Sequence, residues 1–365
     1  MNPQNGYLFT TNGRASSSKV KAGITLSSVS NARAYRIDQY LNDLIHVQNK
    51  KIDASDMKEM LADVYDAYAA IKCPLMVKIV SRPGLLERYI NDTKILSQTK
   101  KWIASLKRWD YKFDVDSVDA TIFMLWEYYF TDGMFQNQIL DRKIRNHRET
   151  FSSNQHFTMN TLKELTKEPN YLSQYCQTDI KNETNACVGL LSKSFISIYN
   201  YLVKEGSNYD HMSARYGNYH KVEYTHSPFS STALKFLFHR TDEDSGSKNT
   251  INVGNPFFAE FESNGINSFQ TPNYRMIVDF GNDSDNYYSL ETGDSESILL
   301  NFYYFNLHES HFNFEMIPMG FNQLNTTTNK RWSTMRFIYK KWYAEREAEL
   351  AELEKQKLTN EKEDL

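Results

Sequence analysis

Two polar side chains near the start of the chain, Asn12 and Arg33, are of types that stabilise negative charge on an oxygen atom. Asn12 ends a short strand pattern over residues 2–12, and Arg33 opens a helical pattern about twenty residues further on. A side-chain amide donates hydrogen bonds, and a guanidinium holds several donors in a fixed fork. The residues by themselves leave a structural alternative open. Asn followed by Gly is a common hairpin turn, and an arginine at a helix start is commonly a surface residue.

The sequence offers no nucleophile to act beside this pair. Removal of the initiator methionine would expose Asn2, which has no hydroxyl or thiol, and the nearest hydroxyl belongs to Thr10 inside the strand pattern. Cys73 stands in an apolar helical pattern, where burial raises the pKa of a thiol. His220 and His226 are expected to be packed or hydrogen-bonded histidines. No Ser-His-Asp or paired-carboxylate arrangement stands out, so the chain alone is not expected to hydrolyse amides.

Helices are expected to dominate the first part of the chain. An Asp53-x-x-Asp56 capping box starts an apolar repeat of period 3.6 that runs to Ile71, and Pro83-Gly84 breaks the pattern. Further helices are expected over residues 86–107, from residue 116, over residues 160–166 and over residues 184–204.

Short strands and loops are expected over residues 216–321, where Gly, Pro, Asn and Asp separate brief alternating runs. The clearest runs cover residues 274–280 and 297–304. The tail from Trp332 has a helical and increasingly charged pattern, with leucines too sparse for a sustained coiled coil. A solvated helix and a partner-binding helix both remain open for this tail.

Length and composition are those of an ordinary globular protein. The chain has 365 residues, enough for two average domains or one large one. Aromatic residues make up 14%, which indicates a wide packed interior or an extensive contact surface. The net charge of −3, with both signs interspersed, does not point to nucleic acid or to an anionic membrane. No apolar run is long enough for a membrane span, and this chain shows no signal-peptide pattern.

The cysteines and the glycosylation tripeptides give a weak indication of compartment. Cys176 and Cys187 flank a polar segment that could close as a disulfide-bonded loop. Four Asn-x-Ser/Thr tripeptides occur, at Asn91, Asn182, Asn282 and Asn325. Together they favour an exported or endomembrane protein slightly. No pair of residues has metal-ligand spacing such as C-x-x-C, so no zinc site is expected.

Six short blocks follow one another between residues 2 and 279. They are Asn2-Pro3 with Gly6-Tyr7 and Asn12; Arg33-Ala34-Tyr35-Arg36-Ile37; Leu106 with Trp109-Asp110; Tyr216-Gly217-Asn218-Tyr219-His220 with His226-Ser227-Pro228; Phe238-His239-Arg240 with Asn249-Thr250-Ile251-Asn252-Val253; and Tyr274-Arg275-Met276-Ile277-Val278-Asp279. In this order they resemble the C-terminal part of the beta chain in the penicillin acylase family of N-terminal-nucleophile hydrolases. One departure is Gly13, where the family usually has a second Asn.

The resemblance implies an α+β fold that is part of an αββα sandwich. Residues 1–331 would be the family portion, and residues 332–365 a charged helical tail. Within the family portion, the resemblance implies a sheet strand at residues 1–15, mainly helices over 32–206, and mainly strands and loops over 216–321.

The resemblance also implies hydrolysis of linear amide C–N bonds in N-acyl compounds. Asn12 would donate a hydrogen bond to the tetrahedral oxyanion, and Arg33 would orient Asn12 and the nucleophile end of the site. The family's nucleophile is a serine that begins the self-cleaved beta chain, with its own α-amine as base, and no residue of this sequence takes its place. No cofactor is expected in this chain, and a family-type calcium site would lie mainly upstream.

Two interpretations follow. In the first, the chain is one part of a split or truncated hydrolase, whose partner is an upstream nucleophile-bearing segment or chain and whose substrate is a small N-acyl amide. In the second, it is a catalytically inactive relative that serves as a scaffold or interaction subunit. A strand over residues 5–12 would expose unpaired edges without its neighbours, so the isolated chain is expected to associate or to be poorly soluble.

Overall fold

The structure is a computed structural model. The residues that it describes are 3–12, 32–136, 139–140, 148–168, 176, 186–204, 214–226, 229–257, 266–282, 284–293, 307–319, 346, 348 and 351–352. The chain divides into two units, Met1–Met319 and Gly320–Leu365. In the second unit the four described residues are helical. The expected tail helix therefore lies almost wholly outside the described residues, as does the expected strand over 297–304.

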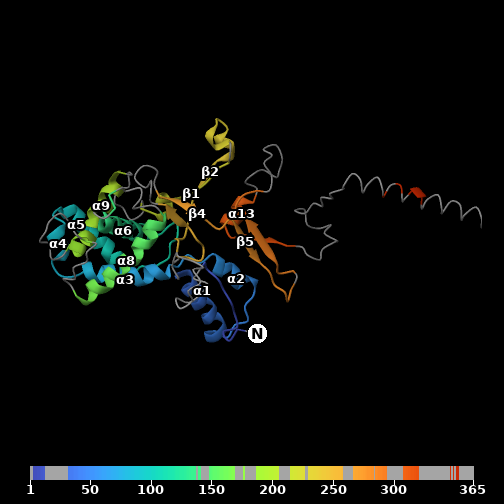
Figure 1. The fold of residues 1–365 in the computed structure, drawn as a ribbon, viewed down its shortest axis with the longest axis horizontal. Helices are drawn as coiled ribbons and strands as arrows, with labels where there is room; N and C mark the ends of the chain where they lie inside the picture. Colours follow the sequence, from blue (N-terminus) through green and yellow to red (C-terminus); the bar gives the residue numbers. More distant parts are fainter. Residues whose placement is uncertain are drawn as a thin grey trace, which may run out of the picture. The chain divides into compact units, whose positions relative to one another are not determined.

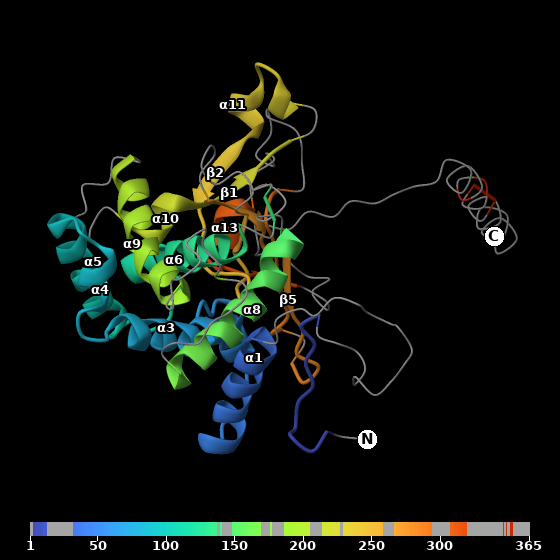
Figure 2. The same ribbon diagram turned by 60° about the vertical axis from the view of Figure 1, so that its left-hand side comes forward.

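Helices make up the first part of the first unit (Figures 1 and 2). They are α1 (Ala32–Asn42), its π-helical continuation η1 (Asp43–Val47), α2 (Ala54–Leu61), α3 (Ala67–Val80), α4 (Leu85–Tyr89), α5 (Thr93–Leu106), α6 (Val118–Phe135), α8 (Arg148–Lys167) and α9 (Ala186–Lys204). Helices α3 to α9 gather on one side in Figure 1, whereas α2 contacts the strand β5 (Tyr274–Ile277).

Strands and short helices follow. The strands are β1 (His220–Tyr224), β2 (Arg240–Glu243), β3 (Asn255–Phe257), β4 (Ile266–Gln270), β5, β6 (Tyr287–Leu290) and β7 (Ile317–Pro318). The short helices are α10 (Tyr216–Tyr219), η3 (Phe229–Ser231), α11 (Lys235–Phe238) and α13 (His308–Phe312). One sheet has the order β2-β1-β4-β3, in which β1 and β4 are parallel, and the other is the antiparallel sheet β5-β6-β7. The α+β class is confirmed, and the four-layer αββα arrangement stays a prediction.

Aspartate caps divide helices that the apolar periodicity had joined. The Asp53 and Asp56 capping box starts α2 as predicted. The same helix does not continue to Ile71, however, because it ends at Leu61 and the Asp66 side chain caps a new helix, α3. The expected helix over 86–107 is likewise divided, by the Asp92 cap of α5. A continuous 3.6-residue repeat cannot reveal such breaks, because the repeat resumes after only a few residues.

Other helix boundaries lie close to their predicted places. The break at Pro83-Gly84 separates α3 from α4, and Gly84 has a φ of 73°, a left-handed conformation that favours glycine. The predicted helix over 184–204 is α9. The predicted helix over 160–166 is the last part of the much longer α8, whose earlier residues are too polar to show the repeat.

Trp126 of α6 lies at the centre of the helical side of the protein. Its side chain is fully buried, its indole N–H donates to the carbonyl of Leu191 at 2.9 Å, and its ring centroid lies 4.5 Å from that of Phe195. Among the described helices, only α9 is long and apolar enough to cross a membrane, over Ala186–Val203. Because 56% of that stretch is buried inside the protein, α9 has the character of a core helix.

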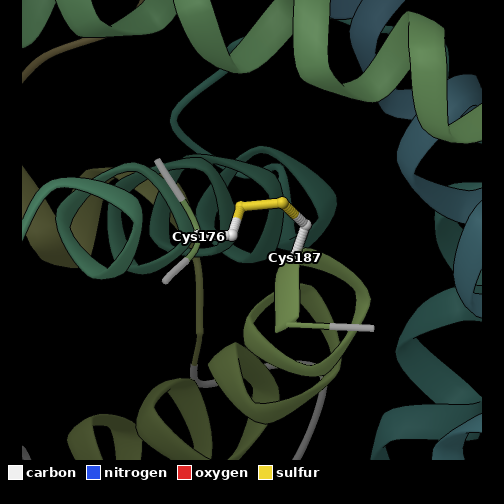
Figure 3. The surroundings of a disulfide bond; sticks show 2 residues. All are labelled: Cys176 and Cys187. Carbon is white, nitrogen blue, oxygen red and sulfur yellow. A yellow bond between two sulfur atoms is a disulfide. The ribbon is translucent and has the colours of Figure 1, made fainter. Parts of the chain in front are cut away.

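The cysteines have the two roles that the sequence predicts. Cys176 and Cys187 form a disulfide, with their Cα atoms 4.9 Å apart (Figure 3). It joins position 176 to the first turn of α9. Cys73 is a buried free thiol, and burial, with a smaller effect of Asp119, raises its pKa to about 12. Cys73 is therefore a side chain that packs in the core. The disulfide does not by itself establish the compartment of the protein, so its export stays a prediction.

Candidate active site

Residues 3–12 lie along α1 and do not form the expected strand at residues 1–15. Contacts along the segment hold them there, including His46 Nε2 to Asn5 O (3.1 Å), Tyr7 Oη to Asp38 Oδ1 (2.7 Å), and Arg33 Nη2 to Thr11 O (3.2 Å). The segment therefore runs antiparallel to α1 (Figure 2). No described strand pairs with it. The expected strand was wrong for the described residues 3–12, because hydrogen bonds to helix side chains take the place of a ladder.

The structure brings Asn12 and Arg33 into direct contact. Arg33 Nη2 donates to Asn12 Oδ1 at 2.8 Å, across a separation of 21 residues. A guanidinium has donors only, so the amide oxygen of Asn12 must face it and Nδ2 must face away. Nδ2 has no partner among the described residues, and the Asn12 side chain is exposed. Asn12 thus presents a free N–H donor whose orientation is set by Arg33.

Local conformation and charge both indicate that this arrangement has a cost. Asn12 has a φ of 60°, in the left-handed region that asparagine tolerates better than most residues. Arg33 stands in the first turn of α1, where the helix dipole disfavours a cation by about 0.3–1 kcal/mol. Burial lowers the pKa of the Arg33 guanidinium. The contacts with Thr11 O and Asn12 offset these costs and hold the pair together.

Most of the chain matches a known protein family. The penicillin amidase family model matches residues 1–328, which include Asn12, Arg33 and all strands from β1 to β7. The chain belongs to the penicillin amidase family. Membership supports an acylase-type hydrolase, in agreement with the resemblance of the six blocks. No curated protein matches the chain significantly.

The Tyr7 hydroxyl, in the same segment as Asn12, is unsuited to nucleophilic attack. The hydrogen bond from Tyr7 to Asp38, with burial and the charge of Asp38, raises the pKa of the Tyr7 phenol. The phenol therefore stays protonated near neutral pH. Its role is to fasten the segment to α1.

No group of three or more metal-ligating side chains occurs in the described part of the chain, so the calcium site stays a prediction.

A serine–histidine contact elsewhere was not foreseen from the sequence. Ser289 Oγ lies 2.8 Å from His311 Nδ1, and His311 Nε2 lies 2.7 Å from the carbonyl of Pro272. This is the geometry of a nucleophile, its base and an orienting acceptor. However, Ser289 and His311 are only 1% and 2% exposed, so no substrate reaches them. The sequences of β6 and α13 contain no nucleophile motif, so the contact between Ser289 and His311 is visible only in the fold. Because both side chains are buried, we assign the pair a structural role.

The two histidines singled out in the sequence are packed, as predicted. His220 is fully buried, its Nδ1 lies 2.8 Å from the carbonyl of Asp244, and its ring stacks on Tyr216. Burial lowers the pKa of His220 to about 4. His226 is buried against the rings of Phe229 and Phe238. Neither His220 nor His226 is exposed enough to act as a catalytic base on a substrate.

Acidification is expected to lower the free energy of unfolding through His311. Burial, and then the charge of Arg275, lower the pKa of His311 from 6.5 to about 4. Between these values the unfolded chain binds a proton that the native protein does not. The stability due to neutral His311 is therefore complete above pH 6.5 and is lost as the pH falls toward 4. We expect a loss of about 1–3 kcal/mol from this residue.

Urea denaturation at neutral and at mildly acidic pH measures this loss. The His311→Gln variant is the comparison, because a glutamine amide can still donate to the carbonyl of Pro272 but does not titrate. The variant should lose less stability on acidification than the natural protein. An equal loss in both proteins would contradict the role given to His311.

Proposed function

We propose that this chain supplies the oxyanion-stabilising part of an amidohydrolase that cleaves linear amide C–N bonds of N-acyl compounds. The observation that carries the proposal is the Asn12–Arg33 contact, in which the amide oxygen is occupied and the N–H donor is directed away. A side chain that only closed a turn would not need a partly buried guanidinium to set its orientation. The match of residues 1–328 to the penicillin amidase family gives this geometry its chemical context.

In the proposed reaction, a hydroxyl nucleophile attacks the amide carbonyl carbon and an O–C bond forms. The carbonyl π electrons move to oxygen, and Asn12 Nδ2 donates a hydrogen bond to the resulting oxyanion. The tetrahedral intermediate collapses as the C–N bond breaks and the nitrogen takes the proton that the nucleophile released. Water then hydrolyses the acyl ester. Arg33 acts throughout by holding Asn12, and it need not touch the substrate.

The nucleophile and its base are proposed to come from a partner, which is an upstream segment or a separate chain. Apolar side chains beside the site support this proposal. Leu8 and Phe9 are 84% and 42% exposed, and Tyr35 on α1 is 60% exposed. Exposed large apolar side chains that lie so near one another in the sequence favour a partner that binds over them. The same exposure also favours the alternative function, an inactive scaffold or interaction subunit.

Turnover by the native assembly distinguishes the two functions. The chain is isolated with its bound partners through a tag at its C-terminus, and the assembly is incubated with a chromogenic phenylacetyl amide and with a long-chain acyl amide. Release of the chromophore is the expected result. If a folded, partner-bound assembly releases no chromophore from either amide, the hydrolase proposal fails and the scaffold function stands.

A further inference from the structure

We propose that the ion pair between Arg36 and Asp63 positions Asn12 for oxyanion stabilisation. The proposal rests on the hydrolase function above and deepens it, because it names residues that act on the site without touching the substrate. Arg36 lies one helical turn after Arg33 on α1, and Asp63 lies between α2 and α3. Neither residue contacts Asn12 directly, so both are positioning residues.

The first observation is that α1 has few apolar contacts of its own. Of its 11 residues, only Ala32 and Leu41 are buried. Hydrophobic packing usually fixes the place of a helix in a protein, and two buried apolar side chains give little of it. The direction of α1, and with it the place of Arg33, therefore depends strongly on polar contacts.

The second observation is the geometry of the ion pair. Arg36 Nε lies 2.5 Å from Asp63 Oδ2, and the two side chains are 20% and 8% exposed. The guanidinium also lies over the ring of Tyr65, with its carbon 4.5 Å from the ring centroid. A pair that is mostly buried and also stacked on an aromatic ring is better ordered than an exposed surface pair.

The third observation is that Asp63 is itself fixed to the sheet part of the protein. Its Oδ1 accepts from the backbone N–H of Tyr65 at 2.8 Å, and its carbonyl accepts from the N–H of Asn252 at 3.0 Å. Asn252 in turn accepts from Arg275 of β5 at 3.1 Å. The pair thus connects α1, which carries Arg33, to a segment that is hydrogen-bonded to Asn252 and, through it, to Arg275 of β5.

Enzyme sites are sensitive to such connections, since a displacement of about 1 Å can reduce turnover by about 10²-fold. We expect Asp63→Asn to lower kcat about tenfold with KM unchanged, because the amide keeps the size of the side chain and removes the charge. Arg36→Lys should lower kcat less than Arg36→Ala. Asp116→Asn is a control for the loss of a paired carboxylate at the surface, because Asp116 pairs with Arg215 at 2.6 Å and its side chain is 74% exposed.

A double-mutant cycle separates positioning from general destabilisation. In an Asn12→Ala background, Asp63→Asn should cause no further loss of kcat, because the donor that it positions is already absent. An equal loss in both backgrounds, or no loss in either, overturns the proposal.

Amide hydrogen exchange tests the positioning role of Asp63 without relying on turnover. If the natural assembly shows no turnover, the hydrolase proposal fails, but Asp63→Asn should still speed amide exchange in residues 5–12 and in α1 while α5 is unaffected. Unchanged exchange in residues 5–12 and α1 would overturn the positioning role.

Discussion

Asn12→Ala is expected to reduce kcat of the proposed hydrolase assembly by about 10²–10³-fold, the loss found when one oxyanion donor is removed. The expected KM is nearly unchanged, since the hydrogen bond strengthens only as charge develops on the substrate oxygen. The prediction follows from the orientation of the amide, because Arg33 occupies Oδ1 and leaves Nδ2 as the donor. The measurement is steady-state hydrolysis of the chromogenic amide that the natural assembly cleaves.

Asn49→Ala is a close control for this experiment. Asn49 is also an exposed asparagine in the left-handed region, with a φ of 52°, so alanine brings a similar backbone cost there. The two variants should differ little in stability and greatly in kcat. Equal kcat values for the Asn12 and Asn49 variants would remove Asn12 from the catalytic site.

Lys72→Met is expected to lower the free energy of unfolding by about 3–5 kcal/mol, because it leaves the mostly buried Glu127 carboxylate without the ammonium that it contacts. The Lys72 side chain is fully buried, and its Nζ lies 2.6 Å from Glu127 Oε1 and 3.0 Å from Thr158 Oγ1. Burial lowers the pKa of Lys72, and the charge of Glu127 opposes this effect. The pair joins α3 to α6 inside the helical core.

The double variant with Glu127→Leu tests the same reasoning in the other direction. Replacing both charges by apolar side chains removes the unpaired carboxylate, and such replacements are often neutral or stabilising. We therefore expect the double variant to regain most of the stability lost by Lys72→Met in urea denaturation. Lys100→Met is the surface control, because Lys100 and Glu87 are 55% and 47% exposed, and it should cost less than about 1 kcal/mol. A double variant as unstable as Lys72→Met would contradict the account.

Local residue patterns predicted the structural features that depend only on residues close together in the sequence. The Asp53 and Asp56 carboxylates satisfy the free N–H groups at the start of α2, so the capping box is visible from spacing alone. The Pro83-Gly84 break and the disulfide between Cys176 and Cys187 were predictable for similar reasons. In each case the relevant atoms belong to residues that are near one another in the chain.

The break between α2 and α3 depends on residues far away in the sequence. The N–H of Phe113 donates to the carbonyl of Val64 at 3.0 Å, and the N–H of Asp66 donates to the carbonyl of Tyr111 at 3.0 Å. These bonds hold the residues between the two helices in an extended form. The apolar repeat itself contains no sign of them, because it continues with the same period on both sides of the break.

At the candidate site, residue types and motifs were enough to identify the two side chains, their donor and acceptor types, and the family to which they belong. The fold was needed to show that Arg33 touches Asn12, that the amide N–H faces away, and that residues 3–12 lie on α1 instead of in a sheet. It alone brought Asp63 to Arg36. The physical reason is that a residue type specifies which hydrogen bonds are possible, whereas the path of the whole chain specifies which partners are within reach.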